Sequence, residues 1–431
     1  MANTRITRSI SSGSTTNKFT LSFWIKKSTI SGSSDMWLFE KYNNGSARTW
    51  IRFNTDTAAP RLEVSEYTGT YVFRKITNRV FRDVGAYYHI HIEFNSTLGT
   101  EADRLKIYIN GVQETSFATT NHPALNSTSI IANAGNQHFG YSENGNGNYF
   151  SGIMSHINFT DGYAYAPTSF GEYDANGVWK INTSPSVTYG TNGFFILKDG
   201  NSVTDQSPNT NNFTVGGGTL TNTEDSPSNV FATLNPLINT NQTLSNGNTV
   251  VDFPLGNDAQ MYSTLAFSSG KYYAEFKINS FTADRAHSLV LYTDITTTGL
   301  YLSFCKTGDA NVITSFGSAV QSGLASFSAG DIIGMAVDAD NGTVDFTKNG
   351  SAYGSQVTGL SSNFSGKDLF FGFYGEGHGS LTRVFNASTN FGNGYFGTTA
   401  VASAGTNASG IGIFEYDVPT GYTALSTKGL N

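Results

Sequence analysis

The chain has 431 residues, enough for two or three domains that each bury a core of their own. Charged residues make up only 13% of it, and Gly, Asn, Thr, Ser and aromatic residues replace them, which is typical of short strands and tight turns rather than of disorder. The net charge of −7 argues against a nucleic-acid partner, and no apolar run approaches the ~18 residues of a membrane-spanning helix.

The N-terminal residues 1–18 are polar and rich in Ser and Thr, with Arg5 and Arg8 among them. They lack the apolar stretch of a signal peptide, so we expect synthesis in a cytoplasm. Two interpretations of this segment stay open. It is a frayed or edge-strand terminus, or it is an extended arm that docks on a neighbouring subunit.

Strands are predicted from residue 19 onward. Residues 19–25 (Phe-Thr-Leu-Ser-Phe-Trp-Ile) form one with a strongly aromatic face, and residues 87–94 alternate cleanly. In the second strand Tyr88, Ile90, Ile92 and Phe94 fall on one face, while His89, His91 and Glu93 fall on the other. Strands separated by turn signals, without a helical period, predict a β-sandwich.

Two segments carry the same hairpin signal. Residues 104–112 and residues 342–350 both alternate apolar and polar side chains and reach an Asn-Gly pair, Asn110-Gly111 in the first and Asn349-Gly350 in the second. An Asn-Gly pair suits the positive φ angles of a type I′ turn. Two such hairpins, far apart in the chain, predict two all-β domains.

The first region resembles laminin-G-like domains with a concanavalin-A-like jelly roll. The resemblance rests on residues 19–25, 88–90, 107–111 and 150–153, in this order, and covers about residues 15–165. It implies two antiparallel sheets with ligand-binding loops at one rim or on the concave face. Tyr88 stands where that family often has Trp.

The last region resembles SPRY domains, which are also concanavalin-like sandwiches. The matching segments are residues 272–275, 330–334, 344–350 and 390–392. The tail, 414–425, is similar to the segment that follows SPRY domains in phage proteins, and we expect it to pack back on its domain. The side chains expected to make that contact are Phe414, Tyr416 and Tyr422.

Between these regions the strands become brief and turn residues more frequent. Residues 205–214, together with residues 225–229, are similar to a connector of phage tail and virion proteins. The predicted fold class is therefore all-β, with two concanavalin-A-like antiparallel sandwiches (jelly rolls) joined by a short-stranded connector. The predicted parts are an arm (1–18), a laminin-G-like sandwich (19–165), the connector (166–235), a SPRY-like sandwich (236–398) and the tail (399–431).

No catalytic residue is predicted. Glycosidases of this fold need two acids across a cleft, commonly as a cluster on one strand, and the nearest fragment here, Glu172-Tyr-Asp174, lies in the connector. We expect Cys305 to be a buried structural thiol. The chain is therefore expected not to be an enzyme.

No cofactor is predicted either, and the metal content stays open. The resemblance to laminin-G-like domains allows a calcium ion on a rim, where Asp35, Asp56 or Asp161 would serve. Residues 338–349 do not fit an EF-hand loop, because the fifth residue is glycine and the twelfth is asparagine. His89 and His91 have a zinc-like spacing without a third ligand, so a polar outward face is the simpler interpretation.

Two glycine-rich loops flanked by aromatic residues are the candidate ligand sites, residues 138–149 and residues 374–380. Aromatic rings stack on sugars, while amides and carboxylates pair with sugar hydroxyls. A solvated turn-rich loop is the alternative interpretation of each. The candidate ligand-binding residues are Tyr141, Glu143, Asn146, Asn148, Tyr149, Tyr374, Glu376 and His378.

The resemblances together predict a structural protein of a bacteriophage virion, with other virion proteins as partners. It would act as a tail-fibre or receptor-binding component that attaches to a host-surface glycan. A capsid decoration or tail-assembly protein without a ligand is the alternative, and an enzyme that degrades polysaccharide is a further one. No nucleic-acid or membrane partner is expected, and the oligomeric state stays open.

Overall fold

The protein is described here by a computed structural model in which the chain forms two compact units, Met1–Asn222 and Thr223–Asn431. The structure describes residues 3–13, 15–30, 35–54, 60–145, 147–198, 203–238, 242–253, 259–281, 287–293, 301–304, 313–315, 318–325, 327–375 and 385–431. Within this part of the chain almost all regular structure is β, and no helix has the length and apolar character needed to cross a membrane.

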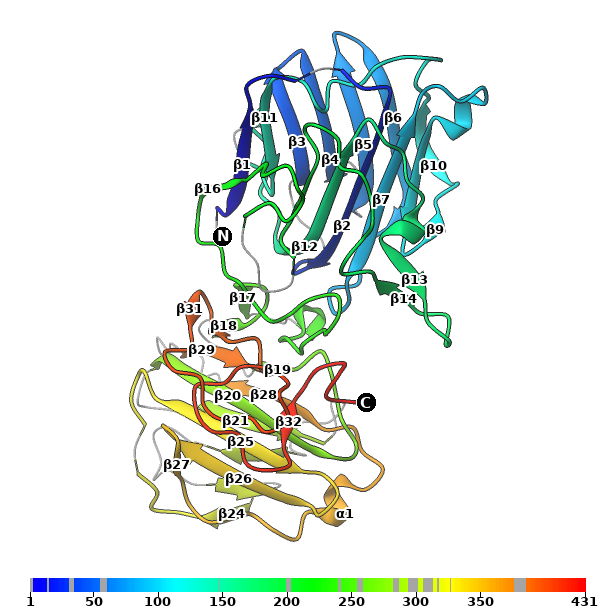
Figure 1. Cartoon of the computed structure of the whole chain (residues 1–431). Coiled ribbons are helices and arrows are strands. Elements are labelled where there is room, and N and C mark those ends of the chain that lie inside the picture. The colour runs from blue at the N-terminus through cyan, green and yellow to red at the C-terminus, as the bar shows by residue number, and fades with distance from the viewer. Residues whose placement is uncertain are drawn as a thin grey trace. The chain divides into compact units, whose positions relative to one another are not determined.

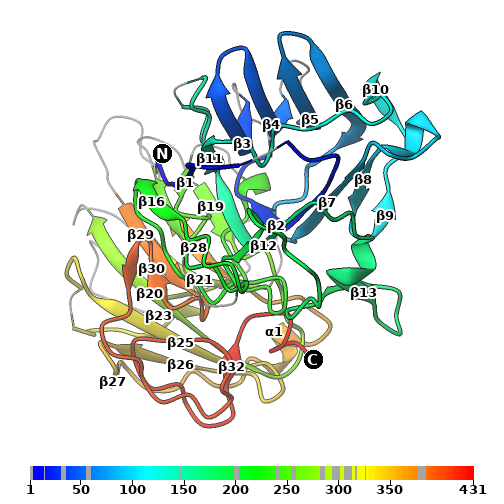
Figure 2. The same cartoon turned by 45° about the horizontal axis from the view of Figure 1, so that its top comes forward.

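The first unit contains an eight-stranded sheet. Figures 1 and 2 show its strands β3, β4, β5 and β6 side by side. In spatial order the sheet consists of β10 (Phe117–Asn121), β6 (Tyr71–Val80), β5 (Arg61–Thr68), β4 (Ala47–Asn54), β3 (Met36–Asn44), β11 (Gly135–Phe139), β1 (Arg5–Ile10) and β16 (Thr214–Gly217).

A six-stranded sheet packs against it. In spatial order it consists of β15 (Phe194–Ile196), β12 (Gly152–Asp161), β2 (Lys18–Lys27), β7 (Tyr88–Asn95), β8 (Leu105–Ile109) and β9 (Val112–Gln113). Alternate residues of both sheets meet in one apolar core; the rings of Phe73 on β6 and Phe94 on β7, for example, lie 5.6 Å apart. The sandwich that the alternation predicted is therefore present. A short helical turn, η1 (Glu101–Asp103), precedes β8.

The N-terminal segment differs from the predicted arm. Residues 5–10 form β1, which pairs antiparallel with β11 on one side and with β16 on the other. Ile6 lies opposite Phe139 and belongs to the core. The segment is thus an interior strand of its own unit, neither an edge strand nor an arm, because β16 comes from a part of the chain that the sequence assigned to the connector.

The connector is divided between the units after residue 222. Its first part belongs to the first unit, because its aromatic side chains are buried there; Phe194 and Phe213 lie in the core of the sandwich. This part contains the turn η2 (Pro167–Ser169) and a small two-stranded sheet of β13 (Gly171–Tyr173) and β14 (Trp179–Ile181).

The polar outward face predicted for residues 87–94 is wrong, because His89 and His91 are fully buried. The segment that contains η2 and β14 covers this face of the six-stranded sheet. Trp179 donates its indole N–H to Nδ1 of His89 over 3.0 Å, and Nε2 of His91 lies 2.9 Å from the carbonyl oxygen of Tyr165. Burial lowers the pKa of His91 to about 3 and that of His89 well below its usual range, so both rings stay neutral.

The two Asn-Gly turns have the same geometry. Asn110 and Asn349 both have φ of 50°, and Gly111 and Gly350 both have φ of 78°. Each asparagine accepts a hydrogen bond through Oδ1 from a backbone N–H of the neighbouring strand, from His89 over 2.7 Å in the first unit and from Ile332 over 2.9 Å in the second.

Each turn glycine also lies beneath an aromatic ring. A Cβ added at Gly111 would fall 2.4 Å from a ring carbon of Trp179, and one added at Gly350 would fall 2.6 Å from a ring carbon of Tyr416. Glycine is thus required at both positions for two independent reasons, the positive φ and the close approach of the ring.

We expect Gly111→Ala to lower the unfolding free energy of the first unit by about 2 kcal/mol, because strain at positive φ adds to a clash with Trp179. Gly177→Ala is the matched control, since Gly177 has a φ of 76° with no atom within 4 Å of the added Cβ. Its effect should stay near ~1 kcal/mol. Denaturant unfolding of both variants checks this, and equal effects would show that contact with Trp179 is unimportant.

The second unit is also a two-sheet sandwich. One sheet consists of β17 (Thr243–Ser245), β18 (Val250–Phe253), β29 (Phe385–Asn390), β20 (Lys271–Phe281), β25 (Ile332–Asp338), β26 (Thr343–Lys348) and β27 (Ser351–Ala352), with β32 (Thr423–Ala424) added parallel to β20. The other consists of β19 (Ala259–Tyr262), β28 (Phe370–Gly375), β21 (His287–Tyr292), β22 (Tyr301–Phe304), β23 (Ile313–Ser315) and β24 (Ser318–Gln321). The remaining elements are η3 (Pro236–Ile238), α1 (Ser361–Phe364), β30 (Tyr395–Phe396) and β31 (Thr399–Ala400).

The tail packs on the sheet that contains β20. Phe414 and Tyr422 are buried with Tyr273 in a small apolar cluster, and the rings of Phe414 and Tyr273 lie 5.0 Å apart. The fully buried carboxyl group of Glu275 accepts the backbone N–H groups of Glu415 and Tyr416, each over 2.8 Å. The tail therefore covers a sheet face of the second unit as the segment around β14 covers one in the first.

Candidate functional site

The predicted loop after β11 closes into a tight hairpin. The backbone N–H groups of Ser142 and Gly147 each bond to the carbonyl oxygen of the other, over 3.0 and 3.1 Å. Asn148 has a φ of 54°, and its carbonyl oxygen accepts the N–H of Trp37 over 3.0 Å, which joins the hairpin to β3. Asn146 lies outside the described residues. We call the described residues of 142–148 the rim hairpin.

Tyr141 and Tyr149 lie together, but Tyr141 is buried. Their ring centroids are 5.3 Å apart, and Tyr141 is also 5.4 Å from the ring of His138. The Arg5 guanidinium lies 4.3 Å above the ring of Tyr141 and donates to the hydroxyl of Tyr149 over 3.1 Å. Tyr149 is partly exposed and accessible to a ligand, while the buried ring of Tyr141 packs against it.

Glu143 is held by protein partners. Its Oε2 lies 2.6 Å from Nε2 of His138 and accepts the side-chain amide of Asn136 over 3.0 Å. About a third of the side chain, 32%, remains exposed. Of the predicted residues in this loop, the structure therefore brings Tyr141, Glu143 and Tyr149 together around β11.

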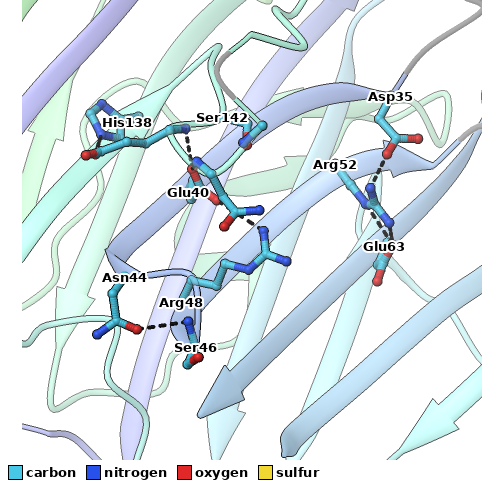
Figure 3. Close-up of polar contacts among 12 residues, drawn as sticks. Asp35, Glu40, Asn44, Ser46, Arg48, Arg52, Glu63, His138 and Ser142 are labelled. Atoms are coloured by element: carbon cyan, nitrogen blue, oxygen red, sulfur yellow. Dashed lines mark hydrogen bonds and ion pairs between the residues drawn. The ribbon is translucent and has the colours of Figure 1, made fainter. Parts of the chain in front are cut away.

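Glu40, which Figure 3 shows in the same region as His138 and Ser142, connects the rim hairpin to β3. Its Oε2 accepts the backbone N–H groups of Glu143 and Asn144, over 2.6 and 3.3 Å. Burial raises the pKa of Glu40 to about 7, although these N–H groups and Arg48 act to lower it. Oε1 has no hydrogen-bond partner and lies 3.7 Å from Nη1 of Arg48.

Beside the rim hairpin, β3, β4 and β6 present a layer of aromatic rings and guanidinium groups. We call Trp37, Arg48, Trp50, Arg52 and Tyr71 the arginine–tryptophan face. The indole rings of Trp37 and Trp50 are 6.2 Å apart, and Trp50 lies 6.1 Å from Tyr71. Arg48 lies 4.6 Å from the centroid of Trp50 and 5.9 Å from that of Trp37, and Arg52 lies 5.5 Å from that of Trp37.

Period-2 alternation places the side chains contributed by β4 on the face opposite the core, and Tyr71 reaches this face where the register of β5 and β6 shifts. In β4, Ile51 and Phe53 point into the core, so Arg48, Trp50 and Arg52 point away from it. The two indoles are 4% and 3% exposed, whereas Tyr71 is 39% exposed and the side chain of Arg48 is 20% exposed. A ligand would therefore meet guanidinium edges and a tyrosine ring, with the indoles as a support beneath them.

Glu63 is the centre of the polar network on this face (Figure 3). Its fully buried carboxylate accepts hydrogen bonds from Arg52 over 2.8 Å, Asn54 over 2.9 Å and Arg74 over 2.9 Å. Burial alone would raise the pKa of Glu63, but Arg52, Asn54 and Arg74 outweigh it and lower that pKa. Arg52 is also paired with Asp35.

The candidate loop of the second unit is described only at its beginning. Tyr374 lies in β28 at intermediate exposure and packs against a small cluster that contains Tyr262 and Tyr292. Glu376 and His378 lie outside the described residues, so the structure does not bring the three together.

The acidic residues proposed for calcium do not form a calcium site in the described part of the chain. Asp35 is paired with Arg52, and Asp161 accepts the backbone and side-chain N–H groups of Asn192 over 3.2 and 3.1 Å. A cation would have to displace these donors. Asp56 lies outside the described residues.

No group of three or more His, Cys, Asp or Glu side chains suited to a metal occurs among the residues that the structure describes. His89 and His91, which carried the zinc-like spacing, are engaged with Trp179 and Tyr165 instead. Cys305 lies outside the described residues.

The arginine–tryptophan face is the feature that sequence reasoning missed. Its signal was present in residues 48–52, Arg-Thr-Trp-Ile-Arg, where two arginines and a tryptophan alternate with core positions. Charged side chains on the same strand face as an indole indicate a surface that holds guanidinium groups against rings.

Residues 3–164 match the family model described as "Concanavalin A-like lectin/glucanases superfamily". Together with the observed sheets, this match confirms the predicted all-β fold class and, for the first unit, its concanavalin-A-like character. A search of curated proteins gave no match to the chain.

Among solved structures, the SPRY domain of human HERC1 is similar at 16% identity and a TM-score of 0.31, covering 36% of this chain and 96% of that one. Domain 4 of AbnA, a GH43 extracellular arabinanase from Geobacillus stearothermophilus solved with arabinotriose, is similar at 17% identity and a TM-score of 0.25, covering 37% and 65%. The SAP-like pentraxin of Limulus polyphemus is similar at 14% identity and a TM-score of 0.27, covering 38% and 72%. Matches this distant carry no argument about function.

Proposed function

We propose that the first unit binds carbohydrate, without cleaving it, at the arginine–tryptophan face and the adjoining rim hairpin. The observation that carries the proposal is the partly exposed layer of Tyr71 and Arg48 over two buried indoles. Sugar rings stack on aromatic side chains through their C–H groups, while their hydroxyls pair with charged and amide groups. This face offers both kinds of contact in a preformed arrangement.

Rigidity supports the proposal. Tyr71 is held between the rings of Trp50 and Tyr67, at 6.1 and 5.3 Å, and Arg74 lies 5.0 Å from its centroid. Side chains held in this way lose little conformational freedom when a ligand binds, which favours affinity.

The placement of the two buried acids of this face, Glu40 and Glu63, supports a role without catalysis. Glu40 lies opposite Trp50, which lies opposite Ser65, so Glu63 is two strands and two residues away from Glu40. That register separates their Cα atoms by about 12 Å, with Trp50 and Arg52 between them. Glycosidase carboxyl groups lie ~5–9.5 Å apart and face the substrate, whereas both of these are fully buried and held by protein donors.

The proposed setting is a phage virion, where the protein would attach to a host-surface glycan. Only the resemblance of residues 205–214, 225–229 and 414–425 to phage virion proteins supports that setting. Many copies on one particle would make a weak site effective, because linked sites bind with high avidity.

The test is a glycan array probed with the full chain, presented on beads at high valency. We expect the chain to bind a subset of glycans. Tyr71→Ala should lower the affinity for them by about tenfold or more, since one aromatic contact contributes about 1.5 kcal/mol. Tyr163→Ala is the matched control, because Tyr163 is similarly exposed, at 42%, and lies elsewhere in the first unit.

No binding to any glycan, or an equal loss in both tyrosine variants, would contradict the proposal. Release of shortened products from a bound polysaccharide would contradict its non-catalytic part.

A further inference from the structure

Arg48 differs from the other two arginines of the large sheet near Glu63. Arg52 and Arg74 both donate to Glu63, and Arg52 is also paired with Asp35. Arg48 has no hydrogen bond to any described residue, and its nearest carboxylate oxygen is Oε1 of Glu40 at 3.7 Å. Its guanidinium is therefore fixed by stacking on the two indoles, while its donors remain without acceptors.

Further donors without acceptors surround it. Among the described residues, the indole N–H groups of Trp37 and Trp50 and Nε of Arg48 are buried atoms with no hydrogen-bond partner. The two tryptophans are themselves 4% and 3% exposed. A buried N–H without an acceptor is rare in folded proteins and destabilising, so three in one cluster mark a place where the described residues leave hydrogen-bonding capacity unused.

We infer that this cluster takes the carboxylate of an acidic sugar, with Arg48 as the residue that binds it. The inference rests on the proposed carbohydrate-binding function and names the ligand class for the same site. A planar carboxylate supplies acceptor oxygens for the partly exposed side chain of Arg48, and it matches the fork of a guanidinium through two parallel hydrogen bonds. The exposed edge of Arg48 leaves room for such an approach.

Glu40 makes this binding depend on pH. The charged groups that face Glu40 are Arg48 from β4 and Glu143 from the rim hairpin, and Glu143 is paired with His138 from β11. An ionised Glu40 would repel a carboxylate bound at Arg48, so protonated Glu40 favours the ligand. Since the pKa of Glu40 is about 7, affinity for an acidic sugar should fall as the pH rises through neutrality.

The experiment measures the full chain against uronic-acid and sialic-acid glycans and against the methyl esters of the same glycans. We expect the esters to bind about 10- to 100-fold more weakly than the acids, which is the range for a charge-assisted pair of hydrogen bonds. Arg48→Gln should remove that preference, and Arg48→Lys should retain part of it. Thermal melting of each variant shows whether it is folded.

Arg79→Gln is the control for loss of one positive charge. Arg79 lies on β6 of the same sheet, is paired with Glu114 and has a side chain that is 44% exposed. Its replacement should leave the preference for acids unchanged. Between pH 5.5 and 8 the parent chain should lose about five- to tenfold in affinity for the acids, and Glu40→Gln should not.

Equal binding of acids and esters would overturn the inference and leave carbohydrate binding standing. If folded Arg48→Gln bound acids and esters with equally reduced affinity, the inference would also be overturned, because Arg48 would then act only by packing. Absence of binding to every glycan would overturn the proposed function and this inference together.

Discussion

Replacing Glu275 with alanine is expected to lower the unfolding free energy of the second unit by about 3–5 kcal/mol, because each buried donor left unpaired costs about 1–3 kcal/mol. The carboxyl group of Glu275 is fully buried. It accepts the backbone N–H groups of Glu415 and Tyr416 and the side-chain amide of Asn390, over 2.8, 2.8 and 3.1 Å. Without it, the tail loses its polar attachment to β20 and the apolar cluster around Phe414 loosens.

Denaturant unfolding of the full chain measures this effect, and limited proteolysis reports release of the tail. Asp368→Ala is the matched control, since Asp368 is an exposed carboxylate of the same unit, and it should stay within about 0.5 kcal/mol of the parent. If Glu275→Ala changed stability no more than Asp368→Ala, Glu275 would not be what holds the tail.

The same residue gives a pH signature. Burial raises the pKa of Glu275 to about 7, so between the pKa of an unfolded glutamate and 7 the folded state binds more protons than the unfolded state. Its contribution to stability is therefore fully present below about pH 4.3 and is lost as the pH rises through about 7. Glu275→Gln should remove this part of the pH dependence.

Replacing Glu63 with alanine is expected to lower the unfolding free energy of the first unit by about 3–5 kcal/mol, the usual effect of removing one partner from a buried ion pair. Arg52, Arg74 and Asn54 would all lose an acceptor on the arginine–tryptophan face. Among the described residues, Arg52 is the one of these three side chains that has a further carboxylate partner, Asp35.

The comparison with Glu63→Gln separates charge from hydrogen bonding, because glutamine keeps one acceptor oxygen but no charge. Glu172→Ala, at an exposed site in the same unit, is the control and should be near neutral. Since the pKa of Glu63 is lowered, its contribution to stability is present above the pKa of an unfolded glutamate and is lost as the pH falls through the folded value. A small effect of Glu63→Ala at pH 7 would show that the arginines find other acceptors.

The two sandwiches were predictable because period-2 alternation and Asn-Gly turns depend on neighbours in sequence. Residues 19–25 and 104–112 therefore became the strands and hairpin that their patterns indicate. The covering segments were not predictable in this way. His89 and His91 fit an exposed strand face equally well until a distant Trp179 is placed over them.

The candidate site also has a part that the local sequence predicts and a part that depends on distant residues. The loop around Tyr141 was found from its composition, but burial of that ring depends on Arg5 and His138, which reach it only through the pairing of β1 with β11. The arginine–tryptophan face depends on the register of β3, β4 and β6, which local patterns do not specify when strands are joined by loops of varied length.

The aromatic ring that covers each turn glycine has a consequence for folding during synthesis. Trp179 follows β7 and β8 in the sequence, and Tyr416 follows β25 and β26, so in both units the cover is synthesised after the turn that it covers. Until these later segments have been synthesised, His89 lacks its hydrogen bond from Trp179 and Tyr273 lacks its ring contact with Phe414. During that interval the nascent protein carries aromatic surface that its finished form encloses.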